Sequence, residues 1–311
     1  MLTPLGVLAL ASLYGNESDS AAYLPRGSPL APQRGRSRPA VLWFGDSKSR
    51  EVMVNVGPTA CNQDPWSWKW TEPAEDIFNG SSVAGGSMCQ PGSELSALAY
   101  FLSYGVAAEG PYFRDAYTTK RHKHWMADGC DRCEVSTHSL AKEAVRRFVS
   151  RAPQGVPRVV LLSALNWDFG RHHEYFPTQE PSDWAREYRQ NFTGLARSVQ
   201  SSLDPADRLW LVADYPRLKA FAPCGPSGKE SMNECLRVEI EMAQLAATSV
   251  GDIARELGVG FIDLHGLLLA NGFVKLRSSL LNDRQHPNTM AAHMIWAEIR
   301  SKLNEDFPRS A

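Results

Sequence analysis

The chain has 311 residues, a formal net charge of −1 and a hydrophobic fraction of 43%. This length suits one large α/β domain or two small ones, and it allows a substantial buried core. Because 33 basic residues nearly balance 34 acidic residues, no overall field attracts nucleic acid or an anionic membrane. We therefore expect a small or neutral partner and no nucleic acid.

Residues 1–15 contain the apolar run LTPLGVLALASLYG, which is too short to span a bilayer comfortably. The run resembles the hydrophobic part of a signal peptide, although no Lys or Arg precedes Arg26. A cleaved signal peptide, a short anchor or neither is compatible with it, and no other stable membrane insertion is expected. Residues 16–38 are rich in Ser, Pro, Gly and Arg and predict a flexible linker before a folded domain at 39–305.

The cysteines and glycosylation sequons favour secretion or a lumen of the secretory pathway. The chain has six cysteines, and N-x-S/T sequons stand at Asn16, Asn79 and Asn191. An even number of cysteines in such a compartment predicts disulfides, with Cys61–Cys89 and Cys224–Cys235 as candidate pairings among several. The C-x-x-C of Cys130 and Cys133 lies near two histidines and could bind zinc, but a disulfide is favoured.

Apolar runs and helical patterns alternate along the folded region. The predicted strands are PAVLWFG at 39–45, a weaker strand near 77–83, and runs at 158–166, 208–216 and 259–265. The predicted helices lie at 139–151, 184–199, 236–257 and 288–304, the third of them ended by Gly258. This alternation predicts a three-layer α/β/α sandwich with a mainly parallel sheet of about five strands. Its chemistry should sit at the carboxyl ends of the strands.

The first candidate site follows the first strand, at Gly45-Asp46-Ser47. The glycine permits a sharp turn, and the serine then stands at a strand end beside a predicted helix N-terminus. A nucleophilic hydroxyl belongs in such a position, because nearby backbone N–H groups can face an oxyanion. The alternative is a turn in which Asp46 or Ser47 only caps the helix.

The second candidate site is Asp283-Arg-Gln-His286-Pro287, just before the last predicted helix. A carboxylate three residues before a histidine on a short loop can accept a hydrogen bond from the imidazole. That bond holds the ring in the tautomer that takes a proton from a serine. The alternative is a helix-entry turn with a surface histidine.

Together, the early Gly-Asp-Ser and the late Asp-x-x-His-Pro resemble the SGNH (GDSL-like) hydrolases over residues 40–304. The resemblance implies a flavodoxin-like sandwich with Ser47 as nucleophile, His286 as base and Asp283 as the acid that orients it. It also implies an oxyanion hole formed by Ser47, a glycine after the second strand and an asparagine after the third. The candidates are Gly85, in SVAGGSM, and Asn166, in LLSALNWD.

The sequence departs from the usual family pattern around Asn166, where Ala164 and Trp167 stand in place of the usual residues. A GDS-x-x-R start and a W-D segment are similar to the PC-esterase branch of the family. On that similarity, Arg50 and Trp167 are candidate substrate-binding residues. Arg50 could instead pair with a neighbouring acid.

The resemblance implies a serine esterase that works through an acyl-enzyme, on an ester of a small molecule or a glycan, such as an O-acetyl group. It implies no cofactor and no metal. An O-acyltransferase of the same fold, acting on carbohydrate, and a binding domain without activity remain alternatives. The aromatic run WSWKW at 66–70 could stack on sugars or simply pack against the domain.

Overall fold

The computed structural model describes residues 38–63, 84–103, 105–106, 137–175, 178–216, 232–270, 280–281 and 286–308. By its internal contacts the chain divides into two units, Met1–Gly35 and Arg36–Ala311. All the described residues belong to the second unit. The predicted leader, the predicted linker up to residue 37 and the weaker strand near 77–83 lie outside the described residues.

The described elements alternate between strands and helices along the chain. In chain order they are β1 (Ala40–Gly45), α2 (Ser47–Ala60), β2 (Ala84–Met88), β3 (Ala97–Leu102), α5 (Thr137–Arg151), β4 (Arg158–Leu162), α6 (Asn166–Tyr175), α7 (Pro181–Gln200), β5 (Arg208–Ala213), α8 (Met232–Leu257), β6 (Gly260–Asp263), α9 (Leu264–Ala270) and α11 (Thr289–Asp306).

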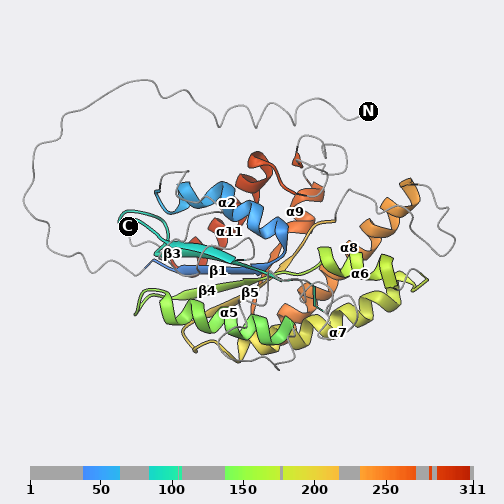
Figure 1. Ribbon diagram of the computed structural model, residues 1–311, viewed down its shortest axis with the longest axis horizontal. Helices are drawn as coiled ribbons and strands as arrows, with labels where there is room; N and C mark the ends of the chain where they lie inside the picture. The colour runs from blue at the N-terminus through green and yellow to red at the C-terminus, as the bar shows by residue number, and fades with distance from the viewer. Residues whose placement is uncertain are drawn as a thin grey trace, which may run out of the picture. The chain divides into compact units, whose positions relative to one another are not determined.

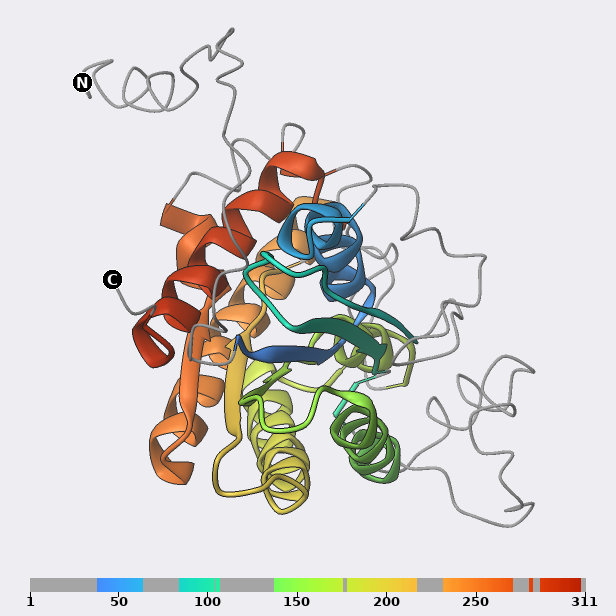
Figure 2. The ribbon, with the colours of Figure 1, turned by 90° about the vertical axis from the view of Figure 1, so that its left-hand side faces the viewer.

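The strands form one sheet in the order β2-β3-β1-β4-β5-β6. β3, β1, β4, β5 and β6 run parallel, and β2 pairs antiparallel with β3 at the edge. Figures 1 and 2 show α2 and α11 on one face of the sheet and α5 and α7 on the other, where α8 packs against α7 and β5. The predicted three-layer sandwich is therefore confirmed.

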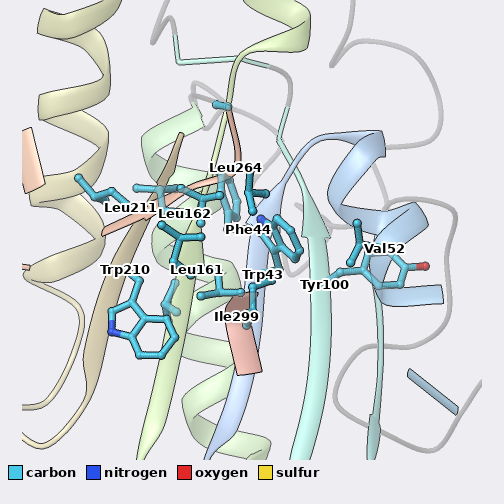
Figure 3. Close-up of a cluster of buried hydrophobic side chains, with 14 of the residues drawn as sticks. Trp43, Phe44, Val52, Tyr100, Leu161, Leu162, Trp210, Leu211, Leu264 and Ile299 are labelled. Carbon is cyan, nitrogen blue, oxygen red and sulfur yellow. The ribbon is translucent and has the colours of Figure 1, made fainter. Parts of the chain in front are cut away.

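The central strands are buried along their whole length because helices cover both faces of the sheet. Every residue of β1 and β3 is buried. Figure 3 shows side chains of β1, β3, β4 and β5 together with Val52 of α2, Leu264 of α9 and Ile299 of α11 in this core. Such a core holds the strand ends, and the residues that follow them, at fixed separations.

The sheet differs from the sequence prediction at its β2–β3 side. β3, with the sequence ALAYFL, was not predicted, because a fully buried strand has no polar alternation to distinguish it from a short helix. β2 lies at Ala84–Met88 and includes Gly85. The parallel neighbour of β1 on this side is therefore β3, and the loop after β3 is the one that adjoins the end of β1.

Candidate active site

Ser47 is the first residue of α2 and follows the turn that ends β1. A Cβ atom on Gly45 would lie 2.6 Å from the Oγ atoms of both Ser49 and Ser163, so this turn requires glycine. Ser47 is half-buried. Its backbone N–H lies in the first turn of α2, where N–H groups have no acceptor within the helix. The turn thus presents a hydroxyl and a backbone donor together.

Asp46 caps α2 and ties it to the start of α6. Its Oδ1 accepts a hydrogen bond from the backbone N–H of Lys48 at 2.8 Å, and its Oδ2 accepts one from the backbone N–H of Asn166 at 3.2 Å. The residue is 1% exposed, so these bonds are shielded from water. One carboxylate therefore fixes the residues after β1 relative to those after β4.

The imidazole of His286 reaches the hydroxyl of Ser47. The distance from Nε2 to Oγ is 2.8 Å, between residues 239 positions apart in the chain. In the neutral ring with its proton on Nδ1, Nε2 is an acceptor and the serine O–H donates to it. The two groups are therefore placed for proton transfer from hydroxyl to imidazole.

Backbone contacts fix the segment that carries His286. Leu281 and Pro287 form an antiparallel bridge, and the N–H of Asn288 donates to the carbonyl of Leu280 at 2.9 Å. These contacts join the residues on the two sides of the 282–285 segment. They hold the backbone next to His286 against Leu280 and Leu281.

The start of α11 is anchored both within the helix and to α2. The side chain of Asn288 caps α11 by accepting from the N–H of Ala291 at 3.0 Å. The hydroxyl of Thr289 donates to Oδ1 of Asn55, in α2, at 2.9 Å. The helix that begins with the nucleophile is thus bonded to the helix that follows the histidine.

Asp283, expected to orient His286, lies outside the described residues. Its role therefore stays a prediction.

Asn166 stands at the first position of α6, after the carboxyl end of β4. It is 4% exposed, and its side-chain Oδ1 has no hydrogen-bond partner among the described residues. Asp46 accepts from its backbone N–H. The backbone of Asn166 is therefore fixed relative to Asp46, while the unpaired Oδ1 is an acceptor and cannot bind an oxyanion. The role of its side-chain N–H₂ group as an oxyanion donor stays a prediction.

Gly85 does not occupy the expected position. It lies inside β2, paired with Tyr100 of β3, at the edge of the sheet. The glycine after the parallel neighbour of β1 is Gly105, whose φ is +97°. Gly85 was expected to follow the second strand, and this expectation is wrong because the residue lies within β2. Its role as an oxyanion donor stays a prediction.

Asp168 holds the loop that contains Gly105 against α6. The N–H of Val106 donates to its Oδ1 at 3.0 Å and to its Oδ2 at 3.2 Å. A Cβ on Gly105 would lie 2.9 Å from Oδ1 of Asp168, so this close approach requires glycine. The loop after β3 and the start of α6 therefore form one unit.

The two candidate substrate-binding residues lie near these strand ends. Arg50 is in the first turn of α2, and its Nη2 donates to Oε1 of Glu51 at 3.1 Å, which is the ion pair considered as its alternative role. Trp167 follows Asn166 in α6 and is half-buried. Their contact with a substrate stays a prediction.

The structure adds a buried lysine that the sequence did not single out. Lys48 is 2% exposed, and its Nζ lies 3.0 Å from Oδ2 of Asp214 and 4.0 Å from Oδ2 of Asp46. The same ammonium donates to the carbonyl of Tyr215 at 2.8 Å and lies 4.5 Å from the centre of its ring. Asp214 and Tyr215 directly follow β5. Polar residues at that strand end were the sequence feature that could have pointed to this cluster.

Burial raises the pKa of Asp214 to about 6, with a further contribution from the negative charge of Asp46. The positive charge of Lys48 opposes this rise. Burial lowers the pKa of His265, and Lys48 lowers it further while Asp263 opposes the change. The lysine thus lies at the centre of a buried cluster of ionisable groups.

The cysteine and sequon predictions are tested only in part. Cys61 and Cys89 form a disulfide, as expected, and Cys235 is also disulfide-bonded. Asn191 lies half-buried in α7. The remaining cysteines, the other two sequons, the WSWKW run and the candidate zinc ligands near the C-x-x-C lie outside the described residues.

Two searches of the described residues gave no candidates. No group of three or more His, Cys, Asp or Glu side chains in this part of the chain could hold a metal ion. No helix within the same residues is long and apolar enough to cross a membrane.

Comparison with known proteins gives similar structures but no similar sequences. No family model matches the chain, and no curated protein matches it. Among solved structures, the chain is similar to Axe2, an acetylxylan esterase from Geobacillus stearothermophilus, with 12% identity and a TM-score of 0.44. That alignment covers 89% of this chain and 99% of the esterase.

The chain is also similar to a protein of Bacteroides fragilis that is provisionally described as an acylhydrolase. Here the identity is 11% and the TM-score 0.46, with 86% of this chain and 88% of that chain covered. At these values the case for function rests on the residues of this chain.

Proposed function

We propose that the protein is a serine esterase that hydrolyses an acyl ester through Ser47 and His286. The observation that carries this proposal is the 2.8 Å contact between Nε2 of His286 and Oγ of Ser47. A second observation supports it: the serine begins α2, where free backbone N–H groups favour a developing negative charge. If Ser47 only capped α2, no histidine side chain would be required within hydrogen-bonding distance of its hydroxyl.

The reaction would proceed in two steps. His286 takes the proton of Ser47 as the hydroxyl oxygen attacks the ester carbonyl, and it then gives that proton to the departing alcohol. Water, deprotonated by the same imidazole, attacks the acyl carbon; the bond to Oγ of Ser47 breaks, the acid leaves, and His286 returns the proton to Ser47. Asp283 would accept a hydrogen bond from Nδ1 of His286 and hold the ring in the required tautomer.

The oxyanion formed in each step would be stabilised by three donors. These are the backbone N–H of Ser47, the side-chain amide of Asn166 and, in place of Gly85, the backbone N–H of Gly105. The support is positional: the three residues follow β1, β4 and β3, which are adjacent in the sheet. Arg50 and Trp167 would then contact the acyl or alcohol part of the substrate.

The direct test replaces Ser47 and His286 separately by alanine and measures hydrolysis of p-nitrophenyl acetate. Each change should lower kcat by at least about 10³-fold, because neither partner attacks efficiently without the other. The exposed Ser201, at the end of α7, provides the matched control, and Ser201→Ala should retain full activity. Circular dichroism should show an intact fold in each variant.

A fluorophosphonate probe identifies the nucleophile independently of substrate choice. It should label the wild-type protein at Ser47 and leave the folded Ser47→Ala variant unlabelled. A folded wild-type protein that resists the probe and hydrolyses no ester would overturn the proposal and favour a binding domain. Assays with O-acetylated oligosaccharides, with and without a carbohydrate acceptor, would separate hydrolysis from acyl transfer.

A further inference from the structure

A buried charge network lies directly behind the proposed nucleophile. Lys48 follows Ser47 in the chain, yet its side chain extends away to the end of β5, where it meets Asp214 and the carbonyl of Tyr215. Asp46, on the other side of Ser47, lies 4.0 Å from the same ammonium. The residues flanking the serine are therefore bonded to a strand two positions away in the sheet.

The network contains one cation and two carboxylates, all less than one-tenth exposed. Isolated carboxylates are costly to bury, and two of them in one place repel each other unless a cation lies between them. Within the part of the chain that the structure describes, Lys48 is the only lysine or arginine that forms an ion pair with Asp46 or Asp214. Loss of its charge would leave both carboxylates buried with backbone N–H donors but without a neighbouring cation among the described residues.

Asp46 links this charge network to the residues around Ser47 and Asn166. Its carboxylate accepts from the N–H of Lys48, in the first turn of α2, and from the N–H of Asn166. It can accept both bonds well only while both of its oxygens stay in place. Displacement of Asp46 would move the donors of Ser47 and Asn166 relative to each other.

We propose that Lys48 is a positioning residue of the esterase: its buried ammonium holds Asp46 and Asp214 together, and so keeps Ser47 in register with Asn166. This inference rests on the proposed function. Lys48 does not touch the substrate. It acts through Asp46, and its effect should appear in the chemical step more than in substrate binding.

The test replaces Lys48 by methionine, which keeps the length of the side chain and removes its charge. The variant should show kcat lowered by about 10-fold to 100-fold, with KM changed by less than about threefold, as expected when reacting groups are misplaced by fractions of an ångström to 1 Å. The rate of fluorophosphonate labelling at Ser47 should fall in parallel, while the labelled fraction still reaches completion. Completion shows that the lost rate is not due to unfolded protein.

A second substitution tests the charge balance. Adding Asp214→Asn to Lys48→Met relieves the repulsion between the carboxylates and should restore part of kcat. Lys302, whose partly exposed ammonium pairs with Glu305 on α11, provides the control, and Lys302→Met should match the wild type.

Each outcome decides the inference. If Lys48→Met turns over like the wild type, the positioning role is wrong, although Ser47-dependent hydrolysis still stands. If Lys48→Met does not fold, kcat is compared between two folded variants, the single variant Asp214→Asn and the double variant Lys48→Met/Asp214→Asn. A lower kcat in the double variant supports the role, and equal values overturn it. A wild-type protein without Ser47-dependent turnover overturns the function and the positioning role together.

Discussion

Asn166 illustrates how one residue can serve as both structure and chemistry. Its backbone N–H donates to Asp46, which fixes the residue relative to the end of β1. In the proposed mechanism its side-chain N–H₂ group donates to the oxyanion, because only a donor can stabilise that charge. The unpaired Oδ1 is an acceptor and takes no part in this role.

We expect Asn166→Ala to lower kcat by about 100-fold and to change KM little, because an oxyanion donor acts mainly in the transition state. Steady-state kinetics with p-nitrophenyl acetate measure this split. Asn166→Asp keeps the size of the side chain but removes its donors, so it should be as slow as the alanine variant. An aspartate variant with wild-type kcat would rule out the donor role.

The sequence predicted some residues of the site better than others. Ser47 and His286 could be found because each lies in a short motif whose context, a strand end or a helix start, is local. Lys48 and Asp214 could not, because their contact depends on which strand lies two places from β1. Gly105 was missed for the same reason, since its proposed role follows from β3 being the neighbour of β1.

At the scale of elements, the N-cap residue of α11 has two structural roles. Asn288 caps the helix and also bonds through its backbone to Leu280, across the segment that carries His286. α7 begins differently: its N-cap residue, Glu180, makes no side-chain capping bond. The two helix starts therefore form a natural pair for comparison.

Asn288→Ala should lower the free energy of unfolding by about 1 kcal/mol, because the first turn of α11 loses its acceptor. Urea unfolding followed by circular dichroism measures the change. Glu180→Ala should alter the free energy of unfolding by less than about 0.5 kcal/mol, since it removes no cap. Equal losses in the two variants would show that the Asn288 cap contributes nothing of its own.

The elements themselves were predicted unevenly. Long amphipathic helices such as α8 have enough turns for their period to be evident, and Gly258, with a φ of +63°, ends α8 as expected. β3 is short and wholly buried, so its sequence lacks a period. β2 owes its strand conformation to pairing with β3, which no local pattern expresses.

At the scale of the whole molecule, the buried cluster should make stability depend on pH. The pKa of Asp214 rises from 3.8 in the reference state to about 6 in the folded protein. Between these values the folded protein keeps a proton that the unfolded chain releases. The stability that protonated Asp214 contributes is therefore fully present below pH 3.8, and it is lost as the pH rises through about 6.

Asp214→Asn should remove this loss. The variant should therefore gain stability relative to wild type as pH is raised from about 4 to about 7.5: its free energy of unfolding minus that of wild type should increase over this range, in which Asp214 changes charge. Urea titrations at several pH values give the two curves. A constant difference between them would mean that Asp214 is not perturbed in the folded state.

The long separation between Ser47 and His286 has a consequence for biosynthesis. During translation the nucleophile emerges 239 residues before its base. A ribosome-bound intermediate that has already formed β1 and α2 carries an inert alcohol, and hydrolytic capacity would arise only when the α11 segment docks. The proposed esterase would thus be inactive through most of its own synthesis.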